Sequence, residues 1–97
     1  MYQDGLGVPQ NDKEAVTWYR NAAERGNAEA QFRLGAMYEL GKGVPQDLLQ
    51  AHMLFSLAVA AGNIDAIKRM KIAEAKMTAQ QIVKSHDMKK EWLEKYK

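Results

Sequence analysis

The chain of 97 residues holds few side chains of the types that do chemistry. His52 and His86 are the only imidazoles, and they fall in different predicted helices with no neighbouring ligand set in the sequence, so we expect neither a zinc site nor a general base. Ser56 and Ser85 lack a lysine three places on, and there is no Gly-x-Ser-x-Gly segment. Because the chain has no cysteine, it has no thiolate ligand or nucleophile either. The sequence therefore predicts no enzyme activity, no metal and no other cofactor.

Two glycine-rich segments could in principle cradle a phosphate, but their surroundings argue against it. Gly5–Gly7 and Gly41–Gly43 both lack the third glycine and the preceding strand of a dinucleotide loop, and neither ends in the Gly-Lys-Ser/Thr of a phosphate loop. Their similarity is more informative. Gly5-Leu6-Gly7-Val8-Pro9-Gln10-Asn11 and Gly41-Lys42-Gly43-Val44-Pro45-Gln46-Asp47 are near copies, 36 residues apart. They are turns of a repeat.

The same spacing relates identical residues well outside the two turns. The further pairs are Met1 and Met37, Tyr2 and Tyr38, Ala15 and Ala51, Ala22 and Ala58, Gly26 and Gly62, Asn27 and Asn63, Ala30 and Ala66, and Arg33 and Arg69. A fixed period of this length indicates stacked supersecondary units, none of which can bury its apolar face alone.

Each repeat unit has the start, stop and periodicity signals of helices. Asn11 and Asp47 are expected N-caps, with Glu14 and Gln50 three residues on in a capping-box arrangement. The helices that follow carry apolar residues at i, i+3, i+4, i+7 and i+8, which are Ala15, Trp18, Tyr19, Ala22 and Ala23 in one and Ala51, Leu54, Phe55, Ala58 and Val59 in the other. Glycines close the helices, at Gly26 and Gly62 and, with a left-handed residue expected, at Gly5 and Gly41. Asn27 and Asn63 can cap the next helices, so the short turns force antiparallel helix hairpins.

The predicted helix from Ala28 to Leu40 shows how neighbouring helices should meet. A glycine inside a helix costs about 1 kcal/mol relative to alanine, so Gly35 is best explained by close contact with another helix. Phe32 lies off the apolar stripe of this helix. It either packs under the next repeat or is an exposed contact for a partner.

These segments resemble the Sel1-like repeat. The resemblance covers residues 1 to about 70 and is carried by Leu34-Gly35-Ala36-Met37-Tyr38, the turn from Gly41 to Asp47, Ala51, and Ala58 to Gly62. The family is similar to tetratricopeptide repeats. The resemblance therefore implies an all-α fold in which antiparallel helix hairpins stack into a right-handed superhelix, or solenoid, whose concave side, lined by the first helix of each hairpin, recognises proteins or peptides.

The repeat pattern ends after Ala66, where Met70-Lys71 replaces Leu34-Gly35 and Glu74 stands in place of Tyr38. Thr78 and Gln81 then predict a capping box that opens a final helix, with Ile82, Leu93 and Tyr96 on its apolar side and Trp92 at the margin. Met77-Thr78-Ala79-Gln80-Gln81 resembles the tail that closes many bacterial members of the family. We divide the single domain of residues 1–97 into a partial first repeat at 1–26, a full second repeat at 27–62, a half repeat at 63–77 and a C-terminal capping helix at 78–97.

The first predicted helix has lost most of its partner. Leaving Trp18 and Tyr19 in water would forgo about 1.5 to 3 kcal/mol for each large apolar side chain. Either the chain is a piece of a longer array, the interpretation we favour, or this face pairs with another chain. In both cases we expect the isolated chain to self-associate.

Charge and hydropathy narrow the partners further. The formal net charge is +2, but residues 64–97 carry nine Lys or Arg against five Asp or Glu. Because acidic residues interrupt this basic tail, we expect a solvated helix face and no nucleic-acid binding. No apolar run approaches the ~18 residues of a membrane span, and Met1–Gly5 does not begin a signal peptide. Cytoplasm and periplasm both stay open as compartments.

The sequence thus predicts an adaptor or scaffold that binds a protein or peptide on its concave face. The candidate contact residues, on first helices and turned away from the core stripe, are Glu29, Phe32, Arg33, Lys68 and Arg69. Arg33 and Arg69 recur at the repeat spacing and would present two positive groups to an acidic or carboxylate-bearing peptide, unless both simply keep the surface soluble. The alternative is a structural or oligomerising end cap of a larger repeat protein, with no ligand of its own.

Overall fold

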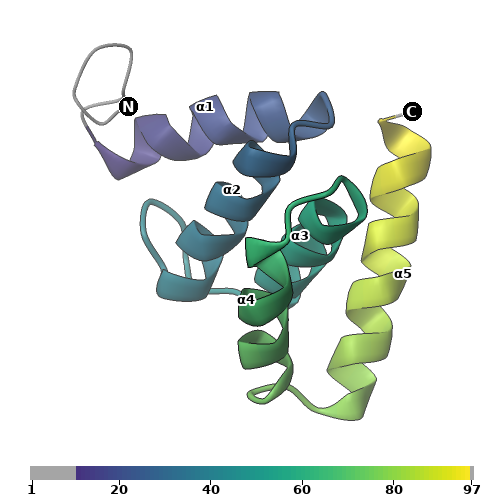
Figure 1. Ribbon diagram of the computed structural model, residues 1–97. Helices are drawn as coiled ribbons and strands as arrows, with labels where there is room; N and C mark the ends of the chain where they lie inside the picture. The colour runs from purple at the N-terminus through teal and green to yellow at the C-terminus, as the bar shows by residue number, and fades with distance from the viewer. Residues whose placement is uncertain (1–10, 97) are drawn as a thin grey trace.

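A computed structural model describes residues 11–96 and shows that the fold is all-α, with five helices and no strand among those residues (Figure 1). The helices are α1 (Asp12–Glu24), α2 (Ala28–Leu40), α3 (Leu48–Ala60), α4 (Asp65–Glu74) and α5 (Ala79–Lys95). Helices that follow one another from α1 to α4 pack side by side, α2 also touches α4, and α5 lies against α3. The predicted helical solenoid is confirmed.

The helix ends follow the capping signals in the sequence. The side-chain oxygens of Asn11, Asn27, Asp47 and Asn63 accept hydrogen bonds from backbone N–H groups three residues on, at 2.8 to 3.2 Å. Gly41 closes α2 in the left-handed conformation, as predicted. The predicted caps at Gly5 and the turn around Pro9 lie outside the described residues.

The three expected capping boxes have different outcomes. Asn11 and Glu14 exchange two hydrogen bonds, but the Glu14 carboxylate accepts from the Asn11 side-chain amide and not from its backbone. Thr78 and Gln81 exchange both hydrogen bonds at the start of α5. At Asp47 the prediction is wrong, because the Asp47 N–H donates to the Tyr38 carbonyl instead, at 3.0 Å, and ties the loop back to α2.

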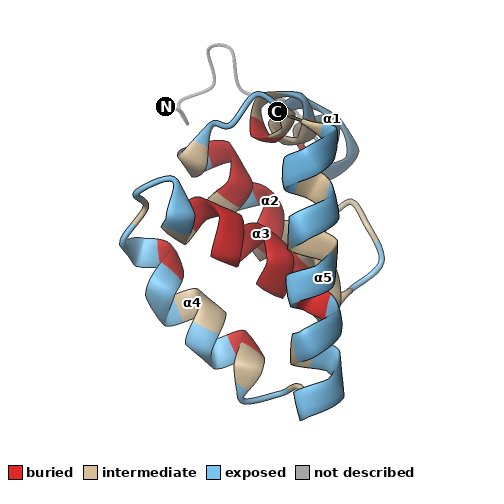
Figure 2. Ribbon diagram, turned by 90° about the vertical axis from the view of Figure 1, so that its right-hand side faces the viewer, coloured by how far each residue is buried: buried red, intermediate tan, exposed pale blue. Residues whose placement is uncertain are grey.

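Helix α3 is the centre of the molecule. Eight consecutive residues, 51–58, are buried, because α2 and α4 cover one side of the helix and α5 covers another (Figure 2). The predicted apolar stripe of α3 is buried as expected, but the rest of the helix is buried too, including His52 and Ser56. The amphipathic description is therefore incomplete, since a helix enclosed by three neighbours has no solvent face.

The contact between α2 and α3 explains Gly35. A Cβ atom on Gly35 would lie 2.8 Å from the ring of Phe55 and 3.3 Å from the carbonyl oxygen of Ala51. Both values are below ordinary contact distance, so only glycine allows the two helix backbones to approach this closely. The predicted close contact with a neighbouring helix is confirmed.

Helix α1 is far less enclosed. It packs chiefly against α2, and only Val16 and Ala23 are buried. Trp18 is 59% exposed, as the sequence predicted, whereas Tyr19 is half-buried against the main core cluster. The bare face of α1 is therefore narrower than expected.

Helix α5 turns most of its predicted side to the core, because Ile82 and Tyr96 are half-buried and Trp92, expected at the margin, packs inward. Ser85 is buried, Met88 and Trp92 pack against the main core cluster, and Leu93 is half exposed. The helix runs along α3 as far as α1, where the Tyr96 hydroxyl donates to the Glu24 carboxylate at 3.0 Å. The predicted place of Leu93 on the buried side is wrong, because the residues of α5 that face the core are Ser85, Met88 and Trp92.

Candidate functional site

A groove runs between α2 and α4. We call it the α2/α4 groove; Phe32 lines one side, and Ile64, Asp65, Lys68, Arg69 and Ile72 line the other. Its volume is about 600 Å³. The face of α4 that points away from the groove is the one that packs, because Ala66 and Ala73 are buried and Met70 lies against the smaller core cluster. The groove is therefore built from the side of α4 that the core leaves free.

Three of the five predicted contact residues meet in this groove. Phe32, Lys68 and Arg69 all line it, although they come from different repeat units. Phe32 packs under the next repeat, with 6.0 Å between its ring centre and that of Phe55, and it also lines the groove; a contact of Phe32 with a partner stays a prediction. Glu29 and Arg33 are exposed on α2 but do not line the groove.

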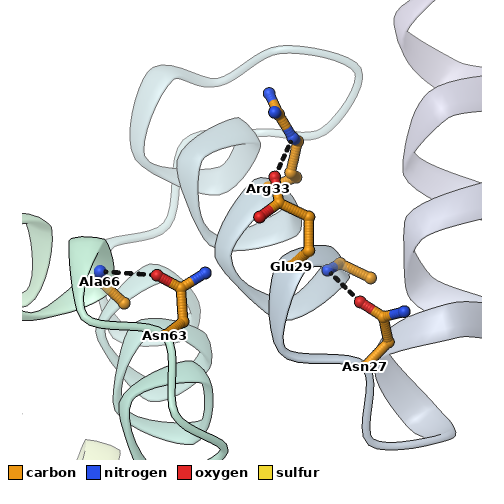
Figure 3. A network of polar contacts seen from close by, with 6 residues as sticks. Asn27, Glu29, Arg33, Asn63 and Ala66 are labelled. Carbon is orange, nitrogen blue, oxygen red and sulfur yellow. Dashed lines mark hydrogen bonds and ion pairs between the residues drawn. The ribbon is translucent and has the colours of Figure 1, made fainter. Parts of the chain in front are cut away.

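The two arginines are not free positive groups. On α2 the Arg33 Nε lies 2.7 Å from the Glu29 carboxylate, one helical turn away (Figure 3). Between helices, Arg69 of α4 reaches the buried Glu39 carboxylate of α2 at 3.1 Å. Among the described residues, Lys68 has no such ion pair. The free cation of the groove is therefore Lys68, and the arginines are already neutralised locally.

Two isoleucines make the groove apolar where it meets water. Ile64 is 78% exposed and Ile72 is 41% exposed. Exposed large apolar residues are unremarkable singly, but these two share one concave surface with the Phe32 ring. The groove thus combines three apolar side chains with the charges of Asp65, Lys68 and Arg69.

A buried polar chain that was not predicted from the sequence lies on the other side of α4. His52 is fully buried in α3; its Nδ1 lies 2.6 Å from the Ser85 Oγ of α5 and its Nε2 lies 2.8 Å from the Glu74 carboxylate. In the tautomer that fits, the Nε2–H donates to Glu74 and the Ser85 hydroxyl donates to Nδ1. One signal could have found it: Glu74 stands where the repeat has Tyr38, and Ser85 interrupts the apolar stripe of α5.

These three side chains are of the types found in a hydrolase triad, but a substrate cannot reach the serine. Ser85 is 1% exposed and His52 is fully buried, so no substrate can reach the serine oxygen. The three side chains join α3, α4 and α5 instead. His86, the other imidazole, lies edge-on to His52 with 5.6 Å between ring centres.

The described residues hold no group of three or more His, Cys, Asp or Glu side chains placed to bind a metal ion. Within residues 11–96 we also find no helix that is both long and apolar enough to cross a membrane.

Comparisons with known proteins agree with this architecture. A family model of the Sel1 repeat matches residues 1–27 and 28–63. A chitin synthase regulator of Malassezia restricta is 40% identical over 63 residues, covering 65% of this chain and 4% of that protein. A component of an ERAD-associated E3 ubiquitin-protein ligase of Arabidopsis thaliana is 32% identical over 74 residues, covering 76% of this chain and 10% of that protein.

A solved structure resembles the chain along most of its length. The crystal structure of c5321, a protective antigen of uropathogenic Escherichia coli strains with an SLR fold, superposes with a TM-score of 0.86 at 34% identity. The superposed region covers 96% of this chain and 20% of the chain of that structure. The chain therefore spans a small part of each of these relatives.

Proposed function

Because the chain belongs to the Sel1 repeat family, we propose that it is a protein-interaction module, an adaptor or scaffold, that binds a protein or peptide partner in the α2/α4 groove. Repeats of this kind generally mediate protein–protein interactions. The relatives named above act in regulation and in a ubiquitin ligase complex, and this is consistent with such a role.

The observation that carries the proposal is the exposure of Ile64 and Ile72 beside Phe32. Covering a large apolar side chain gains about 1.5 to 3 kcal/mol, so a partner that fills this groove gains binding energy there. Elsewhere on α4, Ala66 and Ala73 are buried and Met70 packs inward, whereas Ile67 is 37% exposed outside the groove. The groove is thus the part of this helix best suited to a partner.

The five residues predicted from the sequence take different parts in this proposal. Phe32 supplies apolar surface, Lys68 supplies a free positive charge, and Arg69 keeps its partner Glu39 while forming part of the wall. Glu29 and Arg33, paired on α2, stand as rim contacts at most.

The test uses exposed positions, so that the fold is left intact. Ile64→Asp with Ile72→Asp places two charges in the groove, and Val83→Asp with Leu93→Asp makes the same change on exposed positions of α5. Proteins captured by the wild type and the α5 variant, but lost by the groove variant, should then bind the purified wild type directly in calorimetry. Equal direct binding of those proteins by both variants would refute the proposal.

A second candidate function is an oligomerising or structural end cap with no ligand of its own, and Trp18 is the observation that favours it. Trp18 is 59% exposed on α1, whereas its repeat equivalent Leu54 is 1% exposed on α3. Light scattering over a range of concentrations should show a rising mass for the wild type and a constant mass for Trp18→Ser. A strictly monomeric wild type would count against it.

The segment from Met77 to Gln81 resembles the tail of bacterial members of the family, so a bacterial source is a prediction. The relatives named above include a fungus and a plant as well as a bacterium.

A further inference from the structure

The chemistry of the α2/α4 groove limits what can enter it. Its walls offer three apolar side chains and three charged ones, and no Asn, Gln, Ser, Thr or Tyr side chain lines it. Amide side chains are the groups best able to bond both an N–H and a C=O of a bound peptide backbone. This groove has none.

Several backbone groups at the ends of the two helices are already bonded. At the end of α2 the carbonyls of Met37, Tyr38 and Glu39 accept hydrogen bonds from Lys42, Asp47 and the Gln46 side chain. At the start of α4 the Ala66 N–H donates to the Asn63 side chain (Figure 3). The described residues contain no strand whose edge a peptide could extend. An extended peptide would therefore bring one N–H and one C=O per residue into a groove whose lining, among the described residues, offers only two unpaired polar side chains, Asp65 and Lys68.

A helical ligand does not meet this difficulty. An α-helix bonds its own backbone groups internally and presents only side chains to a groove. Apolar residues at i, i+3 or i+4, and i+7 would contact Phe32, Ile64 and Ile72. The volume of about 600 Å³ lies within the ~300–1,000 Å³ range of ligand pockets and suits the side chains along one face of a helix.

We propose that the α2/α4 groove takes an amphipathic α-helix of a protein partner, with bulky apolar side chains facing Phe32, Ile64 and Ile72 and a carboxylate flank beside Lys68. The inference rests on the function proposed above and adds the conformation and charge of the ligand. The acidic flank follows because Lys68 is the cation without an ion pair among the described residues, whereas Arg69 is held by Glu39.

The experiment compares two displayed peptide libraries of equal diversity. One presents randomised residues on one face of a helix-favouring Ala/Glu/Lys scaffold, and the other presents the same residues in linear peptides interrupted by proline, which cannot form a helix. Both are selected against the immobilised chain, and the dissociation constants of synthesised hits are measured by fluorescence anisotropy. Binders should come from the helical library, with apolar residues on one face and Asp or Glu on its flank.

Variants separate groove binding from adhesion elsewhere. Ile64→Asp with Ile72→Asp should weaken the helical hits at least tenfold and Lys68→Glu about threefold to tenfold, while Val83→Asp with Leu93→Asp leaves them unchanged. Circular dichroism should show that the hits gain helix on binding. Lys68→Glu without effect would remove the acidic flank from the inference.

The outcomes distinguish this inference from the proposed function. Hits from the proline library alone that are lost with the groove variant would overturn the helical ligand and keep the interaction module. A lack of any groove-dependent hit from either library would overturn the helical ligand, and if direct capture also failed, the module with it.

Discussion

Helices α1 and α3 occupy the same place in successive repeats, but they differ strongly in how many of their residues are buried. Each has 13 residues, and residue numbers correspond at a shift of 36. In α3 eight residues in a row are buried, whereas in α1 only Val16 and Ala23 are. The difference lies in the neighbours, because α3 touches α2, α4 and α5 while α1 packs chiefly against α2. A helix in this fold owes its core to the units on either side of it.

The sequence records part of this difference. Met53 and Leu57 of α3 are buried, and the equivalent positions of α1 are Thr17 and Asn21, which are exposed. That side of α1 is therefore polar and exposed to solvent. At Trp18, by contrast, it keeps an apolar residue where α3 has Leu54, so this is the side of α1 that is open to contact.

We call the contact of α1 with α2 the first seam and the contact of α3 with α4 the second seam, and the two differ in the same way. Between α1 and α2, Arg20 donates a hydrogen bond to the Tyr38 hydroxyl and lies over its ring. Between α3 and α4 the place of Tyr38 is taken by Glu74, which binds the buried His52. In the first seam Arg20 and Tyr38 are both half-buried, whereas in the second His52 is fully buried and the Glu74 side chain is 34% exposed.

Truncating the large aromatic residue of each helix should show the largest difference. Phe55→Ala is expected to lower the free energy of unfolding by about 3 to 5 kcal/mol, since the ring is fully buried against Gly35. Its equivalent Tyr19→Ala should cost about 1 to 1.5 kcal/mol, because Tyr19 is half-buried. Urea denaturation followed by circular dichroism measures both. Equal costs would show that α1 is as enclosed as α3.

Replacing His52 of α3 by valine, the residue at the equivalent position of α1, tests the buried polar chain. His52→Val, which copies Val16, should cost about 2 kcal/mol because the buried Ser85 hydroxyl loses its short hydrogen bond and keeps only the Leu49 carbonyl, at 3.5 Å. Adding Ser85→Ala removes that stranded hydroxyl and should recover part of the loss. The same denaturation assay applies, and a double variant whose cost equals the sum of the two single costs would contradict the coupling.

The smallest effect is expected at the more open seam. Tyr38→Phe keeps the ring and removes the hydrogen bond from Arg20, whose guanidinium can turn to water. We expect a loss of about 0.5 to 1 kcal/mol. A loss larger than that of His52→Val would reverse the ranking of the two seams.

Features set by local spacing could be predicted from the sequence. The 36-residue repeat, the cap residues, the close approach at Gly35 and the shared surface of Phe32, Lys68 and Arg69 all follow from periods that helices and repeats obey. The polar chain could not be predicted, because His52 and Ser85 are 33 residues apart and α5 lies outside the repeat. The predicted apolar side of α5 was correct except at Leu93, because Met88 and Trp92, and not Leu93, pack against the core.

The ion pairs were also beyond the sequence. Equal spacing correctly placed Arg33 and Arg69 at equivalent positions of α2 and α4, but it could not show that each had a carboxylate close by. Only the side-chain geometry distinguishes a neutralised arginine from a free lysine. The free positive group of the candidate site is therefore Lys68, and not Arg33 or Arg69.

The central claim is that α3 holds α2 and α4 in place, so that the groove between them exists before any partner binds. Native-state hydrogen exchange resolved by residue tests it most directly. The amides of α2, α3 and α4 should exchange together with the highest opening free energy, and those of α1 should exchange sooner. An α4 that opens independently of α3, or an α1 as protected as α3, would contradict the account.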